Sequence, residues 1–187
     1  MAVKTMAKNT GTGQYNAGWH ELTISKAVDG KWNDKRTIDL NFENYPDNMR
    51  HRVFESTNKT TGEEFKIANL FRFACAGIIS VLKDPTGKNP VIQYDDEVTN
   101  LVGTRVNVLF VKEASKTDGK EYSRTFDLVP VVQETEHLTW TDDDVARLKN
   151  SIEKQYSKRT ATTTNGVGTV TLDTTTTTTG NAEEIPF

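Results

Sequence analysis

The chain has one cysteine, Cys75, among its 187 residues. A single thiol excludes an internal disulfide and a zinc site built from cysteines. Because Cys75 lies in the apolar stretch ANLFRFACAGII, we interpret it as a small core residue rather than a nucleophile. No apolar run approaches the roughly 20 residues that cross a bilayer, and residues 1–16 lack the apolar segment of a signal peptide. We therefore expect a cytoplasmic protein that does not enter a membrane.

The sequence also lacks the residue patterns that catalysis requires. Its histidines, His20, His51 and His137, are far apart, and none has a metal-binding spacing. No glycine-rich phosphate-binding loop follows a predicted strand, and no serine has the flanking glycines of a nucleophile elbow. We expect a protein that is not an enzyme and that has no cofactor and no metal site.

Charge is divided unevenly along the chain. The formal net charge is −3, and residues 161–187 contain Asp173, Glu183 and Glu184 but no lysine or arginine. The whole net charge therefore lies in the last part of the chain, and residues 1–160 are neutral. A neutral body does not exclude nucleic-acid binding, because a local basic groove matters more than the sum of the charges.

Alternating apolar and polar residues predict strands. Leu22 and Ile24 share one face of the first predicted strand, and Ile38, Leu40 and Phe42 share one face of the second. The five predicted strands span residues 19–27, 36–42, 49–54, 101–112 and 120–132. The turn residues DGKWN, at 29–33, join the first two into a hairpin.

Two segments predict helices. Residues 63–82, EEFKIANLFRFACAGIISVL, have apolar residues near helical spacing, and residues 83–90 then form an exposed loop. Thr141 followed by three aspartates is typical of a helix start, so a second helix should end near residue 159. The expected fold is mainly β: a five-stranded barrel with a helix between strands three and four and a short C-terminal helix.

Composition divides the chain further. After residue 160 it is rich in threonine, with almost nothing to bury, which is typical of disorder. We expect a flexible leader (1–16), a barrel domain (17–135), a C-terminal helix (136–159), a disordered linker (160–180) and an acidic tip (181–187).

The tip, NAEEIPF, is unusual because an apolar triplet follows two acids at the chain end. Glu183 and Glu184 can pair with a basic rim, while Pro186 stiffens the backbone before the Phe187 ring and its free carboxylate. Ile185 adds apolar surface. These features predict capture by another protein through the C-terminal carboxylate and its neighbours.

A Thr-rich linker ending in EEIPF resembles the single-stranded DNA-binding proteins of bacteria and their phages. The segments GWHELTISKA, EEFKIANLFRFACAGI, GTRVNVLFVK and DGKEYSR also resemble bacteriophage members. Two departures are that the Asp-rich approach to the tip is reduced to two glutamates and that threonines replace the usual Gly/Gln/Pro-rich linker.

The resemblance implies an oligonucleotide/oligosaccharide-binding (OB) fold for residues 17–135. It implies that the protein coats and protects single-stranded DNA without sequence specificity in replication, recombination and repair. The tip would recruit replication or recombination proteins. The resemblance also allows a homo-oligomer, whose size the sequence does not give.

A single strand is held by a positive groove and by aromatic rings on which its bases stack. Alternation puts Arg50, Arg52 and Phe54 on one face of the third predicted strand. The other candidates surround the two predicted hairpins: Trp19, Lys31, Trp32, Lys35 and Arg36 at the first, and Lys112, Lys116, Lys120, Tyr122 and Arg124 at the second. Ordinary surface charges, rings packed on the barrel rim and a solvated hairpin would explain the same patterns.

Two other functions fit the sequence. One is a phage annealing or recombination accessory protein with the same fold, which would pair complementary strands. The other is an adaptor that binds no DNA and docks through its tip. Salt dependence separates DNA binding from the adaptor, because phosphate contacts release counterions and give a steep negative slope of affinity against salt.

Overall fold

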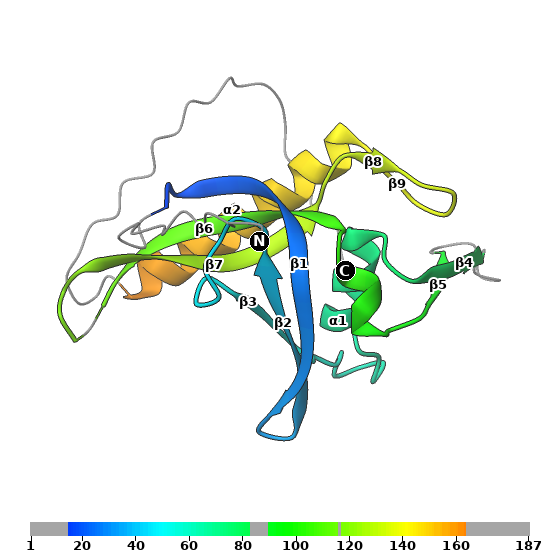
Figure 1. The fold of residues 1–187 in the computed structure, drawn as a ribbon, viewed down its shortest axis with the longest axis horizontal. Coiled ribbons are helices and arrows are strands. Elements are labelled where there is room, and N and C mark those ends of the chain that lie inside the picture. The colour runs from blue at the N-terminus through cyan, green and yellow to red at the C-terminus, as the bar shows by residue number, and fades with distance from the viewer. Residues whose placement is uncertain (1–14, 83–89, 116, 164–187) are drawn as a thin grey trace, which may run out of the picture.

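An antiparallel five-stranded sheet forms the body of the protein, with strand order β3–β2–β1–β6–β7 (Figure 1). The computed structural model describes residues 15–82, 90–115 and 117–163. The five strands are β1 (Gly18–Trp32), β2 (Lys35–Phe42), β3 (His51–Phe54), β6 (Arg105–Ala114) and β7 (Glu121–Pro130). The expectation of a mainly β protein is therefore confirmed.

Smaller elements surround this sheet. The strands β4 (Ile78–Leu82) and β5 (Val91–Tyr94) form one two-stranded sheet, and β8 (Gln133–Glu134) and β9 (Thr139–Trp140) form another. The helices are α1 (Lys66–Ala74), the short 3-10 helix η1 (Val98–Leu101) and α2 (Asp142–Thr163). Within the described residues, no helix is long and apolar enough to span a membrane.

The five-stranded sheet is curled but not closed, which corrects the prediction of a closed barrel. In the described part of the chain, no ladder of backbone hydrogen bonds joins the edge strands β3 and β7. Thr125 Oγ1 of β7 donates a hydrogen bond to the carbonyl oxygen of Arg50, the residue directly before β3, at 3.1 Å. The two edges therefore meet along a seam that side chains line.

The inner face of the curled sheet encloses the main core. The predicted alternation is confirmed, because Ile24, Ile38 and Leu40 are fully buried there. Helix α1 covers one end of this core with Ile67, Leu70, Phe71 and Ala74, residues at helical spacing that all point to one side.

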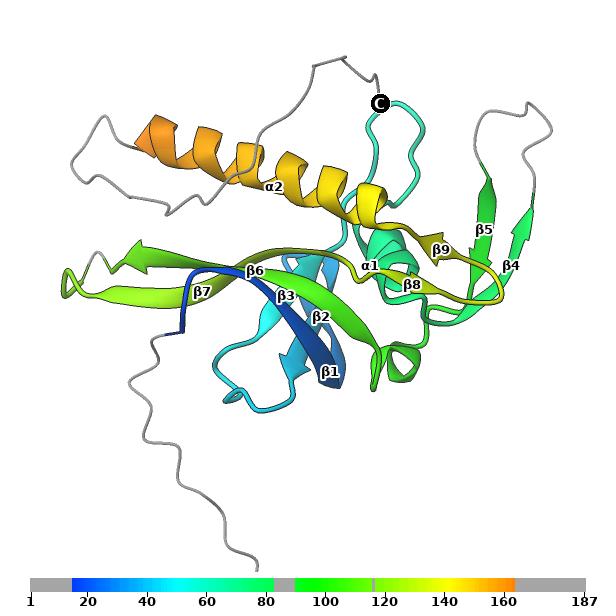
Figure 2. The ribbon, with the colours of Figure 1, turned by 90° about the horizontal axis from the view of Figure 1, so that it is seen from above.

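The opposite face of β6 and β7 is covered by α2 (Figure 2). Because β6 is buried on both faces, Val108 and Phe110 enter the main core while Leu109 and Val111 pack under α2. This double burial explains the almost continuous apolar run VNVLFV, which a half-exposed strand would not carry.

The first hairpin turns later than the sequence predicts. β1 continues through residues 29–32, and the two turn residues are Asn33 and Asp34, with φ of 47° and 62°. Two successive residues with a left-handed backbone conformation are typical of the type I′ turn, which favours asparagine and aspartate. The prediction of a turn at 29–33 was wrong because Gly30 pairs with Thr37 inside the ladder.

The helix predicted over residues 63–82 is also shorter. It begins at Lys66, where the Glu64 carboxylate accepts hydrogen bonds from the backbone amides of Ile67 and Ala68 at 2.8 and 2.9 Å. It ends at Cys75, which is half-buried in the left-handed conformation with φ of 50°. The β-branched run after Gly77 forms β4 instead, which pairs with the unpredicted strand β5.

Helix α2 begins as predicted, with Asp144 N donating to Thr141 Oγ1 at 3.2 Å. It continues to Thr163 rather than ending near residue 159. The rest of the predicted linker, the tip and residues 1–14 of the predicted leader lie outside the described residues.

Gly77 should be the most sensitive glycine of the region that links α1 to β4. Its φ is 62°, and a Cβ atom there would lie 2.3 Å from the backbone oxygen of Asp95. Gly77→Ala should cost about 3 kcal/mol of unfolding free energy, since a clash adds to the left-handed strain of about 1–2 kcal/mol. Urea unfolding measures this loss.

The matched control is Gly103→Ala, because Gly103 has φ of 83° but nothing within 4 Å of its added Cβ. It should lose only the conformational contribution of about 1–2 kcal/mol. Equal losses in both variants would show that the contact with Asp95 does not matter.

Candidate nucleic-acid interface

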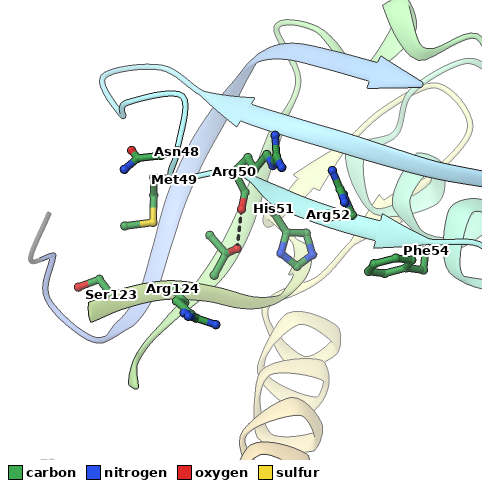
Figure 3. A pocket seen from close by; sticks show the side chains of 9 residues that line it. Asn48, Met49, Arg50, His51, Arg52, Phe54, Ser123 and Arg124 are labelled. Atoms are coloured by element: carbon green, nitrogen blue, oxygen red, sulfur yellow. Dashed lines mark hydrogen bonds between the residues drawn. The ribbon is translucent and has the colours of Figure 1, made fainter. Parts of the chain in front are cut away.

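The seam between β3 and β7 forms an open groove of about 540 Å³ (Figure 3). Residues of β3 and the turn before it line one side, and residues of β7 line the other. The lining residues are Asn48, Met49, Arg50, His51, Arg52, Phe54, Ser123, Arg124 and Thr125. Four of the thirteen residues predicted to bind DNA therefore meet here from two distant parts of the chain.

Alternation along β3 decides which side chains reach solvent. His51 and Val53 are buried, and Arg52 and Phe54 point the other way, as the sequence predicts. Arg50 precedes the strand on the same side and is exposed. The groove thus joins arginines from β3 to Arg124 from β7.

Asp39 offsets part of the positive charge. Its carboxylate accepts two hydrogen bonds from Arg52, at 2.5 and 2.7 Å, and lies 3.6 Å from Arg50 Nε. The bonds from Arg52 lower the pKa of Asp39, which therefore stays ionised. Arg52 is committed to this pair, and its main effect is to hold Asp39 in place.

Arg50 and Arg124 are the more available cations. Their side chains are 52% and 64% exposed, and their closest carboxylates are Asp39 at 3.6 Å and Glu113 at 3.5 Å. Exposed pairs of this length contribute little to stability. Both guanidinium groups can therefore exchange a carboxylate for a phosphate at low cost.

The outer face of β1, β2 and β3 continues the groove toward Trp32. Phe54 lies opposite Thr37 on β2, and Thr37 lies opposite Gly30 on β1. Trp32, two residues further along β1, is on the same face. Phe54 and Trp32 are 44% and 56% exposed, and Gly30 and the buried Thr37 lie between them in the sheet. Two open aromatic rings thus share one face.

Two predicted residues have partners elsewhere. Trp19 packs beside α2, where its Nε1 donates to Glu153 Oε1 at 2.7 Å and Lys149 Nζ lies 5.5 Å from the ring centroid. Arg36 is held between the carboxylates of Asp29 and Asp96, and the bonds from Asp29 contribute most to raising its pKa. Neither side chain lines the groove.

The remaining predicted residues lie at the two hairpins. Lys31 and Lys35 are exposed at the end of the β1–β2 hairpin, and Lys112 and Lys120 belong to the β6–β7 hairpin. The hydroxyl of Tyr122 donates to Asp118 Oδ2 at 2.6 Å. The predicted residues Lys116, Glu183, Glu184, Ile185, Pro186 and Phe187 lie outside the described residues.

Sequence reasoning missed several groove residues. Met49 begins the third predicted strand and Asn48 directly precedes it, and Ser123 and Thr125 flank Arg124 on β7. Asp39, which binds Arg52 beside the groove, was not among the predicted residues either. The pattern of polar residues on β7 was a signal in the sequence for these groove residues. That β7 lies beside β3, however, depends on the curl of the sheet.

A comparison with protein-family models finds none that matches this chain, and a comparison with curated proteins finds no significant match. The structure itself defines the class of the protein as mainly β, with an open antiparallel sheet and two helices.

His51 should make stability depend on pH. Burial lowers the pKa of this imidazole below its ordinary 6.5, although Asp127 and Asp39 oppose the shift and Lys66 adds to it. The unfolded chain therefore takes up the proton first as the pH falls. The free energy of unfolding should be highest above pH 6.5 and should decline as the pH falls below it. A pKa lowered by one pH unit corresponds to a total loss of about 1.4 kcal/mol.

Thermal unfolding at about pH 7.5 and about pH 5.5 measures this decline. His51→Phe should reduce it, because the buried ionisable group is gone. The exposed His137 gives the control, since His137→Gln should leave the decline unchanged. The same decline in His51→Phe as in the native protein would contradict the assignment.

Proposed function

We propose that this protein binds single-stranded DNA without sequence specificity, with the strand held along the seam between β3 and β7. The observation that carries the proposal is the meeting of Arg50, Arg52, Arg124 and Phe54 at one groove. A positive groove beside an exposed ring is the arrangement that sequence-independent single-strand binding uses.

The strand order supports an OB fold. That fold is a five-stranded Greek-key barrel that is partly open. Here the order β3–β2–β1–β6–β7 puts β3 and β7 at the two edges, and α1 follows β3 in the chain. Bringing these edges together closes the sheet in the order that an OB barrel requires, and Thr125 already bonds to Arg50 across the seam.

The groove and the outer face suggest a path for the strand. Phosphates lie along Arg50 and Arg124, where they replace the longer ion pairs with Asp39 and Glu113 at 3.6 and 3.5 Å. Bases stack on Phe54 and, across β2 and β1, on Trp32. Stacking and phosphate contacts accept every base, so the binding is independent of sequence. Recruitment of replication or recombination proteins through residues 181–187 remains part of the proposal on the strength of the resemblance.

Replacing both exposed arginines should weaken binding to all sequences alike. We expect Arg50→Ala with Arg124→Ala to lower affinity for oligo(dT) about tenfold at low salt. The slope of log affinity against log salt should become less steep by about 0.7 for each phosphate that the variant no longer neutralises. Fluorescence anisotropy over a salt series measures both quantities.

The control variant carries Arg105→Ala and Arg147→Ala. These arginines pair with Glu21 and Asp144 and do not line the groove, yet the pair changes the net charge by the same amount. It should keep the native slope. No salt-dependent binding by the native protein would favour the adaptor function, and equal losses in the two variants would place the strand elsewhere.

Trp32 should report the bound strand by its own fluorescence. Oligo(dT) should quench the tryptophan fluorescence of the native protein. Trp32→Phe should remove most of that quenching, because the exposed indole of Trp32 is its source. Trp32→Ala should cost about 1–3 kcal/mol of binding free energy. Trp19→Phe is the control, because that ring packs beside α2. Quenching that persists in Trp32→Phe and disappears in Trp19→Phe would contradict the path.

A further inference from the structure

Strand β1 contains a one-residue bulge where it meets β2. Ile24 pairs with Phe42 of β2. The next paired residue of β1 is Lys26, which lies opposite Asn41, so the ladder skips Ser25. A bulge of this kind places one extra residue in one of two antiparallel strands. It therefore changes the face of the sheet on which every later side chain of that strand lies.

The bulge turns Lys26 outward. Side chains alternate along a regular strand, so the inward Leu22 and Ile24 would predict an inward Lys26 as well. After the extra residue, Ala27 instead packs against the main core, opposite the buried Leu40. Lys26 is exposed and lies on the outer face. Plain alternation along the sequence therefore did not indicate it as a binding residue.

Lys26 extends a row of polar side chains across the outer face of the sheet. Asn41 lies opposite Lys26 on β2. The register of β2 with β3, continued by one residue, puts Arg50 opposite Asn41. Because neighbouring strands are about 4.8 Å apart, the backbones of Lys26 and Arg50 lie about 10 Å apart. Arg50 in turn meets Arg124 at the seam. Arg124, Arg50 and Lys26 thus form a cation row that leads from β7 across β3 to β1.

Lys26 is available to bind a phosphate. Within the residues that the structure describes, no ion pair or hydrogen bond joins its side chain. Lys66 and Arg105, by contrast, are each paired with a carboxylate, at 3.4 and 2.7 Å. An ammonium group without such a partner gives up no ion pair when it binds a phosphate.

Charge on the outer face separates the phosphates of a bound strand from its bases. The row next to the cation row lies roughly 6–7 Å further along the strands. It contains the carboxylate of Asp39, between Val28 and Arg52. An anion there repels phosphates, so the backbone of a bound strand keeps to the cation row. The exposed rings of Phe54 and Trp32 lie beyond Asp39 on the same face.

We propose that Lys26 is a further phosphate-binding residue of the site and that the bulge at Ser25 is what places it there. This inference rests on the proposed function and gives the bound strand an orientation. Its backbone lies over the cation row, and its bases point toward Phe54 and Trp32. The path crosses β3, β2 and β1, so it extends beyond the groove at the seam.

Removing the charge of Lys26 tests this path. Lys26→Ala should lower the affinity for oligo(dT) about threefold at low salt and make the slope of log affinity against log salt less steep by about 0.7. The loss should be the same for oligo(dC), because a phosphate contact carries no base identity. Lys26→Arg keeps the charge and should keep the native affinity and slope. Fluorescence anisotropy over a salt series measures these quantities.

Lys154→Ala is the matched control. Lys154 is an exposed lysine of α2, which covers the opposite face of β6 and β7, and its removal changes the net charge by the same amount. This variant should keep the native affinity and slope. Equal losses in Lys154→Ala and Lys26→Ala would overturn the inference, and so would native binding by Lys26→Ala.

A structural role for Lys26 would give a different result. Because its side chain is exposed, Lys26→Ala should unfold at the native temperature. A lower unfolding temperature, with weaker binding but an unchanged salt slope, would make Lys26 a structural residue and overturn the inference.

The double arginine variant separates this inference from the proposed function. If Arg50→Ala with Arg124→Ala weakens binding and Lys26→Ala does not, the groove holds the strand and only the inference about Lys26 is wrong. If the native protein shows no salt-dependent binding of oligo(dT), the proposed function fails and the inference fails with it.

Discussion

The pairing of one long strand with two different neighbours determines the shape of this protein. β1 pairs with β6 along residues 18–23 and with β2 along residues 24–32. At the changeover, Ile24 is fully buried and bonds through its backbone to Thr104 and Gly103, and the register shifts between Ile24 and Lys26. A bulge bends a strand and increases its twist. The sheet therefore curls around Ile24 and encloses the main core.

The curl also produces the candidate site. Because β2–β3 and β6–β7 extend from opposite parts of β1, their outer edges come to face each other, and mostly polar side chains line the groove between them. A ladder of backbone bonds would have closed that space. The open seam instead exposes Arg50 and Arg124 beside a buried neutral His51, while Asp39 limits the local charge. The result is a groove with a modest positive charge rather than a strongly basic one.

Local patterns predicted much of the fold. The inward faces of β1, β2 and β3 followed from period-two alternation, and the start of α2 followed from the chemistry of Thr141. The errors came where two signals competed. Apolar spacing extended the predicted helix through residue 82, although Gly77 and the β-branched residues after it end the helix and begin β4. The turn was placed at Gly30 because glycine commonly marks turns, yet Gly30 serves here to admit Thr37 opposite it.

The sequence by itself determined which face of each strand is apolar and that Arg50, Arg52 and Phe54 share an outer face, since side chains alternate along any strand. Only the tertiary structure decided which of the candidate residues meet. Arg124 joins β3 because the curled sheet brings its edges together, while Trp19 and Arg36 acquire partners from α2 and from the segment after β5. Such contacts join residues far apart in the chain. They depend on strand curvature and helix packing, which local patterns do not encode.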